Sequence, residues 1–187
     1  MRNVLIVLSG PSGVGKGTIA KQLVDKNKNI SLSISCTTRK AREGEVDGRE
    51  YFFIEREKFL SKIEQDGFLE YSNHFENYYG TPKDFVLNKL VSNDVLLEID
   101  VNGGLNVKKS YPDAVLIMIT PPSKAELEKR LVNRNTESLE KIKLRMQRID
   151  YELGKSDLYD YTVVNDDLAT AIQQVEQIIN KEKNIDN

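Results

Sequence analysis

Cysteine and histidine are almost missing from this sequence, which contains one of each, Cys36 and His74. A single cysteine cannot form a disulfide within the chain, and the two residues are too few for a zinc site built from cysteine and histidine. The composition therefore indicates a reducing compartment, and we expect the protein to work in the cytoplasm. We assign no catalytic role to either residue.

An excess of one charge is missing as well. The sequence has 27 lysine and arginine residues against 29 aspartate and glutamate residues, which gives a net charge of −2. This balance gives no reason to expect nucleic acid or a membrane surface as a partner, so any site for an anion must be local. The apolar run MRNVLIVLSG is too short for a signal peptide or a membrane span, and we interpret it as a buried strand.

Short apolar runs and helical patterns alternate along the 187 residues, a length that suits one domain. Three continuous apolar runs and a weaker fourth predict strands covered on both faces, at residues 4–9, 94–100, 114–120 and 161–166. Helical patterns occupy residues 18–26, 82–92, 123–134, 137–155 and 167–181. The alternation predicts an α/β fold with a parallel sheet core flanked by helices.

Residues 31–81 interrupt this alternation. The stretches SLSISCTTR, EYFFIE and FLEYSNHFENYYG are rich in serine, threonine and aromatic residues and predict short strands, and EKFLSKIEQDG predicts a helix. We therefore expect a small mixed α/β subdomain inserted into the core. Ser123, after two prolines, is the predicted N-cap of the helix that follows it.

GPSGVGKGT, between the first strand and the first helix, has the spacing G-x-x-x-x-G-K of a phosphate-binding loop. Backbone N–H groups, the helix N-terminus and the lysine charge together bind phosphate oxygens. A glycine-rich turn with an ordinary lysine is the alternative, but it leaves the strand and the helix on either side unexplained. The predicted nucleotide-binding residues of this loop are Gly10, Pro11, Ser12, Gly13, Val14, Gly15, Lys16, Gly17 and Thr18.

Gly17 stands where the common motif has serine or threonine. The hydroxyl that usually binds Mg²⁺ is therefore absent, so phosphates and water would hold most of the ion, with Thr18 or Asp100 as candidate protein ligands. This pattern favours a small-molecule kinase that uses many arginines over a signalling GTPase. Arg39, Arg42 and Tyr51 suit a monophosphate, although by composition alone a solvated basic turn is the better reading.

Several stretches together resemble the guanylate kinase family, whose members phosphorylate GMP with ATP. They are LIVLSGPSGVGKGT, SCTTRKAREGEVDGREYFF, FLEY, NYYGTP, LLEIDVNG, ITPPS and VVNDD, and they span nearly the whole chain. The resemblance implies a core at about residues 1–30, 82–122 and 156–187, a GMP-binding subdomain at about 31–81, and a helical lid at about 123–155. It implies ATP and GMP as substrates with Mg²⁺, and it leaves monomer and homodimer as alternatives.

The resemblance also implies an acceptor site. The residues that would bind the GMP phosphate are Arg39, Arg42, Tyr51 and Tyr79, and those that would face the guanine are Ser35, Glu70 and Thr81. Glu45 occupies a family position that contacts this region, and a salt bridge to an arginine explains it equally well. Tyr78 points to the other side of an extended chain from Tyr79, so we expect it to pack rather than bind.

Glu98 and Asp100 end an apolar strand, where the carboxyl ends of parallel strands meet the ligand crevice. They should point the same way and lie beside GMP and the metal-bound water, and the alternative is that they are helix-capping acids. The lid arginines implied by the resemblance are Arg130, Arg134 and Arg145, with Arg148 a weaker candidate. Asn165 would lie near the adenine, which Arg134 would cover. The alternative for the same residues is a turn between strand and helix in which Asp167 is the N-cap.

Two other functions remain open at this stage. A guanylate-kinase-like interaction module that binds peptides is disfavoured, because the phosphate loop, Lys16 and the lid arginines are all present. A kinase for another phosphorylated acceptor would give Ser35, Glu70, Tyr79 and Thr81 no shared binding role.

Glu98, Asn102 and Asn135 are departures from the family pattern.

Overall fold

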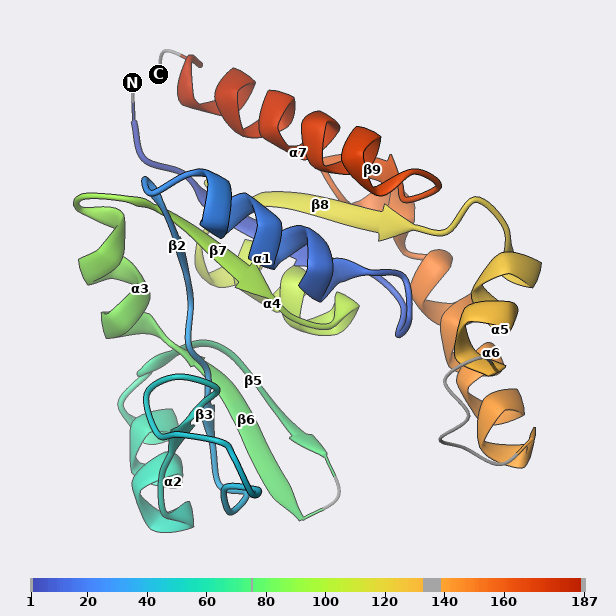
Figure 1. Cartoon of the computed structure of the whole chain (residues 1–187). Helices are drawn as coiled ribbons and strands as arrows, with labels where there is room; N and C mark the ends of the chain where they lie inside the picture. Colours follow the sequence, from blue (N-terminus) through green and yellow to red (C-terminus); the bar gives the residue numbers. More distant parts are fainter. Residues whose placement is uncertain (1, 75, 133–138, 186–187) are drawn as a thin grey trace.

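Two β-sheets organise the chain, and the larger one lies between two layers of helices (Figure 1). The computed structural model describes residues 2–74, 76–132 and 139–185. The larger sheet has the strand order β2-β7-β1-β8-β9, and all of its neighbouring strands are parallel. Its strands are β1 (Leu5–Ser9), β2 (Ile30–Leu32), β7 (Asp94–Glu98), β8 (Val115–Thr120) and β9 (Tyr161–Val164). The predicted parallel α/β core is confirmed.

Alternate residues of the central strand β1 enter two separate hydrophobic cores. Ile6 and Leu8 pack with α1 (Lys16–Lys26) and α7 (Leu168–Lys183) on one face of the sheet. Leu5 and Val7 pack with α3 (Lys83–Leu90) and α4 (Val101–Ser110) on the other face. A strand buried on both faces needs apolar residues at every position, which is why the run LIVLS shows no alternation.

The other helical segments of the described residues are α2 (Arg56–Glu64), α5 (Lys124–Val132), α6 (Leu139–Leu153) and the 3₁₀ turn η1 (Ser156–Leu158). Helices α5 and α6 join the core that contains Ile6 and Leu8, whereas α2 packs through Phe59 in a third cluster with the smaller sheet. The predicted caps are confirmed, because the hydroxyl of Ser123 accepts the N–H of Glu126 at 3.1 Å and the carboxylate of Asp167 accepts that of Thr170 at 2.8 Å. Each cap satisfies a backbone donor that has no partner inside its own helix.

The smaller sheet has the order β4-β3-β6-β5, with α2 beside it (Figure 1). Its strands are β3 (Cys36–Thr37), β4 (Phe52–Phe53), β5 (Phe68–His74) and β6 (Asn77–Pro82). The stretch SLSISCTTR, predicted as strand within the inserted subdomain, is divided between the two sheets, because Ile30–Leu32 pairs with β7 in the core sheet and Cys36–Thr37 pairs with β4 and β6 in the smaller one. Local composition predicts an extended chain but not the sheet that it joins.

Helix α4 was missed from the sequence, because its segment VNGGLNVKKS contains two glycines, which are poor helix formers. Asp100 caps its first turn by accepting the N–H of Gly103 at 2.8 Å. A Cβ on Gly104 would lie 2.4 Å from the hydroxyl oxygen of Tyr159 and 2.9 Å from that of Ser9. Tertiary packing therefore requires the glycine that intrinsic propensity disfavours.

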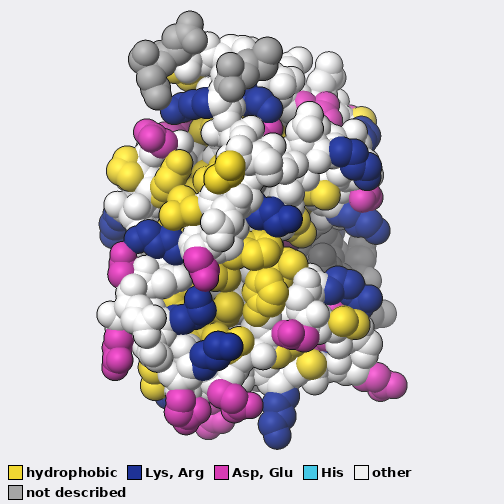
Figure 2. Space-filling model, turned by 90° about the vertical axis from the view of Figure 1, so that its left-hand side faces the viewer, with side chains coloured by type: hydrophobic (Ala, Val, Ile, Leu, Met, Phe, Trp, Pro, Cys, Tyr) yellow, Lys and Arg dark blue, Asp and Glu magenta, His cyan; other side chains and the backbone are white. Residues whose placement is uncertain are grey.

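The surface carries both signs of charge. Figure 2 shows hydrophobic side chains gathered between basic and acidic ones on the face that lies to the left in Figure 1. Lysine, arginine, aspartate and glutamate are interspersed there, so the described side chains on this face form no continuous basic surface of the kind that binds nucleic-acid phosphates. Among the described residues, no helix is both long and apolar enough to span a membrane.

Candidate active site

The glycine-rich loop connects β1 to α1 at the carboxyl end of the core sheet. Gly15, just before α1, has a left-handed backbone with φ 101°, and a Cβ there would lie 2.5 Å from Nδ2 of Asn165. The same Nδ2 donates a hydrogen bond of 2.7 Å to the carbonyl oxygen of Val14. Asn165 is buried, and it therefore holds the shape of the loop from the strand end β9.

Lys16 lies over this loop. Its Nζ donates to the carbonyl oxygens of Gly10 at 2.6 Å and Pro11 at 3.2 Å. Burial lowers the pKa of Lys16, and the negative charges of Glu98, Glu152 and Asp100 oppose that shift. The loop thus concentrates backbone donors and one ammonium group where an anion can bind.

A cavity of about 460 Å³, which we call the loop cavity, opens beside Lys16. Its lining residues are Gly10, Ser12, Lys16, Glu98, Ile99, Asp100, Arg148, Ile149 and Glu152. Arg148 donates from Nε to Glu152 at 2.9 Å, and its Nη2 lies 4.0 Å from Oδ2 of Asp100. Helix α6 therefore places the cation of Arg148 at the loop cavity, and its role as a lid arginine stays a prediction.

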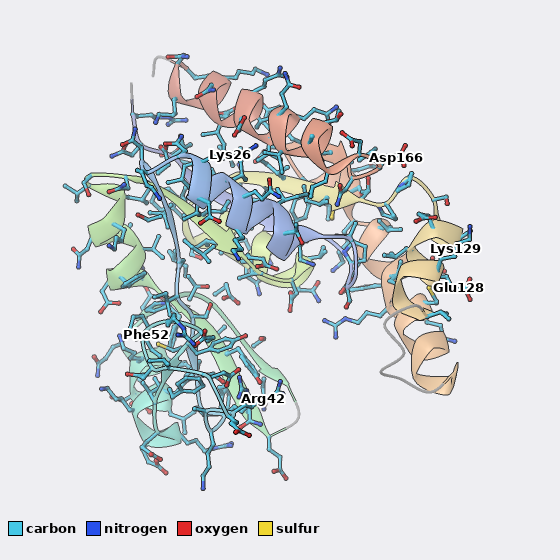
Figure 3. The ribbon with its side chains drawn as sticks, viewed as in Figure 1. Lys26, Arg42, Phe52, Glu128, Lys129 and Asp166 are labelled. Atoms are coloured by element: carbon cyan, nitrogen blue, oxygen red, sulfur yellow. The ribbon has the colours of Figure 1, made fainter. Side chains whose placement is uncertain are left out.

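A cavity of about 590 Å³, which we call the large cavity, lies between the smaller sheet and the end of β7. It is lined by Ser35, Arg39, Arg42, Tyr51, Glu70, Ser72, Asn77, Tyr79, Gly80, Glu98, Ile99 and Asp100. In Figure 3, Arg42 lies on the connection from β3 to β4, near the hairpin of β5 and β6. All the predicted acceptor-site residues except Glu45 and Thr81 line this cavity.

Glu98, Ile99 and Asp100 line both cavities. The two cavities therefore share a wall at the carboxyl end of β7. Asp100 is also the N-cap of α4, so the capping role that we considered as an alternative is real for this residue and does not exclude a place in the site. For Glu98 the structure shows no cap.

Glu45 is an ion-pair partner within the described structure. Its carboxylate accepts hydrogen bonds from Nη1 and Nη2 of Arg39 at 2.8 and 2.9 Å, and from the backbone N–H of Arg42 at 2.8 Å. The hydrogen bond from Arg39 lowers the pKa of Glu45 to about 2, and the same bond raises the pKa of Arg39. The salt-bridge alternative thus describes its contacts, and Glu45 orients Arg39 from outside the lining of the large cavity.

Glu70 and Thr81 form a buried pair across the β5–β6 hairpin. The hydroxyl of Thr81 donates to Oε1 of Glu70 at 2.6 Å, and Thr81 is fully buried. A hydroxyl has one proton to donate, and in this arrangement Thr81 donates it to Glu70. Burial raises the pKa of Glu70 to about 7, and the bond from Thr81 opposes that rise.

Neighbouring residues in β6 have different tasks. Tyr79 lines the large cavity, whereas Tyr78 packs against Phe59 with ring centroids 5.3 Å apart, as predicted from strand alternation. The site residues missed from the sequence include Ser72 and Asn77. Ser72 lies two positions after Glu70 on the same strand, so the period of two could have identified it.

Other predicted residues lie elsewhere. Thr18 is exposed on α1 and lines a separate hollow with Lys21 and Asp25, so its hydroxyl is not at the loop cavity. Cys36 is buried, and burial raises its pKa to about 11, which fits the absence of a catalytic role. Arg134 lies outside the described residues, as do the side chains of Arg130 and Arg145.

The carboxylates beside the loop suit a magnesium ion held mainly by a substrate. Within the described ranges, no group of three or more histidine, cysteine, aspartate or glutamate residues could hold a metal. Glu98 and Asp100 nevertheless offer hard oxygen ligands next to Lys16. Magnesium is usually held by one or two carboxylates together with phosphates and water, and these residues fit that mode.

Comparisons with known proteins agree on one family. A family model described as guanylate kinase matches residues 2–182. Guanylate kinases of Caldanaerobacter subterraneus subsp. tengcongensis and Syntrophomonas wolfei subsp. wolfei are each 50% identical over 97% of this chain, covering 89% and 94% of those relatives. A crystal structure of guanylate kinase from Anaplasma phagocytophilum is 31% identical with a TM-score of 0.77, covering 98% of this chain and 88% of that one.

Proposed function

Because the chain belongs to the guanylate kinase family, it catalyses ATP-dependent phosphorylation of GMP, and we propose which of its residues do so. In this proposal ATP places its phosphates in the loop cavity and GMP occupies the large cavity. The observation that carries the proposal is the wall of Glu98, Ile99 and Asp100 that the two cavities share. Because the two cavities adjoin at these residues, two nucleotides bound in them can react directly, without a covalent enzyme intermediate.

The GMP phosphate would bind between Arg39, Arg42, Tyr51 and Tyr79. Planar guanidinium groups bind a phosphate through paired hydrogen bonds, and tyrosine hydroxyls add donors. Glu45 supports this assignment, because its two bonds to Arg39 hold the guanidinium in one orientation before GMP arrives. The phosphate is thereby fixed in a site that is already formed.

The guanine would lie against Glu70 and Ser35 at the other part of the large cavity. Ionised Glu70 accepts hydrogen bonds from N1–H and N2–H₂ of guanine, and the hydroxyl of Ser35 donates to O6. Thr81 acts through Glu70, because its hydroxyl orients the carboxylate. In this proposal the arrangement would select guanine over adenine.

In the reaction, a phosphate oxygen of GMP forms a bond to the γ-phosphorus of ATP while the bond to the β,γ-bridging oxygen breaks and ADP leaves. Lys16 neutralises charge on the transferring group. Mg²⁺, when bound with ATP, adds further neutralisation, and Glu98 or Asp100 would hold it beside the phosphates. The GMP phosphate is already a competent nucleophile, so no proton-abstracting base is needed.

We also propose the division of the chain given above, with residues 31–81 as the GMP-binding subdomain and 123–155 as a lid. On closing, the lid would bring Arg130, Arg134 and Arg145 to the phosphoryl group and exclude water. Asn165 would contribute to the ATP site by holding the loop through Val14. The cytoplasm, where ATP and GMP occur, is the proposed place of action.

A panel of the four ribonucleoside monophosphates tests the substrate assignment, with ADP release from ATP as the measurement. GMP should exceed AMP in kcat/KM by about four orders of magnitude, because a site built for hydrogen-bond donors rejects a base that lacks them. Comparable rates with AMP, CMP or UMP would contradict the guanine site.

Arg42→Ala should weaken GMP binding at least about tenfold and leave ATP binding within about threefold of the parent protein, since a lost charge-assisted hydrogen bond costs about 1.5–3 kcal/mol. Arg42 tests the phosphate site more cleanly than Arg39, because its guanidinium is exposed and only its backbone N–H binds Glu45. Separate titrations of each nucleotide measure the effect. Arg49→Ala, in the same bend but outside the lining of the large cavity, is the matched control, and equal losses for ATP and GMP would contradict the assignment.

GMP affinity should depend on the ionisation of Glu70, whose pKa burial raises to about 7. The ionised form binds guanine, so affinity is full above this pKa and falls as the pH drops through it, by about tenfold between pH 8 and pH 6. The GMP phosphate also titrates, with a pKa of about 6. Glu70→Gln keeps the phosphate effect and should lose the rest, whereas equal pH slopes in the two proteins would contradict the prediction.

A further inference from the structure

Helix α4 contains a glycine, Gly103, whose missing side chain faces Glu70 of β5. A Cβ at position 103 would lie 3.2 Å from Oε2 of Glu70, which is shorter than the 3.4–4 Å of ordinary van der Waals contact. Its distances to Cδ1 of Ile99 and Oδ1 of Asp100 would be 3.4 and 3.5 Å, within that ordinary range. Of these three neighbours, the Glu70 carboxylate is therefore the one that a methyl group would displace.

The carboxylate of Glu70 is held from two other sides. The hydroxyl of Thr81 donates to Oε1 at 2.6 Å, so a rotation that moves Oε2 away from α4 also strains this bond. The hydroxyl of Ser110, in the last turn of α4, contacts the carbonyl oxygen of Leu69. The backbone next to Glu70 is thus attached to the same helix, and β5 would lose that contact if it moved away from position 103.

Gly103 also lies between two carboxylates of the large cavity. Glu70 and Asp100 both line that cavity. Burial chiefly raises the pKa of Glu70, and the nearby charge of Asp100 adds to the rise. The N–H of Gly103 donates to Oδ1 of Asp100 at 2.8 Å, and alanine would keep this N–H and therefore the cap. A methyl group at position 103 would then act chiefly on Glu70.

We propose that Gly103 is a positioning residue for guanine recognition, because its missing side chain lets the Glu70 carboxylate lie against the first turn of α4. Hydrogen bonds weaken steeply when donor and acceptor are misaligned, so a displaced carboxylate would accept poorly from N1–H and N2–H₂ of guanine. This role explains why the helix has glycine where alanine would favour helix formation. The inference rests on the proposed function, since it requires guanine at Glu70.

The first measurement is the kinetics of Gly103→Ala with GMP and AMP. We expect kcat/KM for GMP to fall about tenfold or more, since a hydrogen bond to a charged group changes binding by about ten- to a hundredfold. The value for AMP and the KM for ATP should stay within about threefold of the parent protein. Asn106→Ala, at an exposed position of the same helix, is the matched control, because it introduces the same residue and should leave GMP kinetics unchanged. A folded Gly103→Ala protein with kcat/KM for GMP within about threefold of the parent would overturn the proposal.

The second measurement is a double-mutant cycle on thermal stability, which tests whether position 103 acts through Glu70. In a Glu70→Ala background, Gly103→Ala should raise Tm by about 2–4 °C, since alanine is the better helix former. In the parent protein the same change should give a smaller gain or a loss, because the methyl group meets the carboxylate. Equal changes of Tm in the two backgrounds would contradict the contact.

The cycle also covers a variant that does not fold. If Gly103→Ala is unfolded alone but folded together with Glu70→Ala, the contact between the two positions is supported. If it is unfolded in both backgrounds, position 103 acts on other residues and the proposal is wrong.

Failure of this inference differs from failure of the proposed function. If Glu70→Gln lowers the GMP-to-AMP ratio of kcat/KM and Gly103→Ala does not, Glu70 recognises guanine without help from position 103. If Glu70→Gln preserves that ratio, the guanine site itself is wrong, and the role of Gly103 in recognition is wrong with it.

Discussion

Lys16→Ala is expected to lower kcat at least about a hundredfold, or about 3 kcal/mol, while the protein stays folded. Lys16 is the ammonium group of the loop, and its Nζ now donates to the carbonyl oxygens of Gly10 and Pro11. ATP phosphates would replace these carbonyls as partners, so the charge is in place before transfer begins. Removing it takes away stabilisation of charge that develops on the transferring phosphoryl group.

The measurement is steady-state kinetics at saturating ATP and GMP, with circular dichroism and thermal unfolding to establish that the variant is folded. Lys26→Ala is the matched control, because Lys26 is an exposed lysine in the last turn of the same helix α1 (Figure 3). It removes the same charge and should keep nearly all activity. A folded Lys16→Ala protein with more than about a tenth of the parent kcat would show that Lys16 does not have this role.

Glu70→Gln is expected to remove most of the preference for guanine. Guanine presents two neighbouring donors, N1–H and N2–H₂, and an ionised carboxylate can accept from both. Adenine presents an acceptor at N1, so the same buried carboxylate would face a lone pair without partners, which costs several kcal/mol. Glutamine turns one acceptor into a donor, and it therefore loses a bond to guanine.

We expect kcat/KM for GMP to fall about a hundredfold or more in Glu70→Gln while the low value for AMP changes little. Glu64→Gln, exposed at the end of α2, is the control for the loss of charge in the same part of the chain. Thr81→Val adds a further test. It removes the hydroxyl bond that opposes the raised pKa of Glu70, so the pKa of Glu70 should rise further. A ratio of GMP to AMP preserved within about threefold in Glu70→Gln would show that Glu70 only stabilises the hairpin.

Local chemistry made several parts of the structure predictable. The strand, loop and helix around Lys16 follow from apolar residues, glycines and helix formers that are neighbours in the sequence. The caps at Ser123 and Asp167 follow from short side chains that reach a backbone N–H three residues away. Each of these features depends on residues close together in the chain.

Other features depended on contacts that no local pattern contains. Helix α4 was missed because Gly104 is explained by Tyr159 and Ser9, which lie far from it in the sequence. Thr81 was expected to face the guanine, and the structure shows that its hydroxyl donates to the buried carboxylate of Glu70. The bond from Asn165 to Val14 joins residues 151 positions apart.

The sequence by itself determined the parallel α/β core, the phosphate loop and, through resemblance, the family and most of the residues that line the large cavity. Only the tertiary structure decided that Asn165 braces the loop, that Glu45 holds Arg39, and that Glu98 fills the space beside Gly17. The physical reason is that a turn or a cap is set by neighbouring residues. Contacts between strands depend on strand order and register, which the burial of whole sheet faces selects.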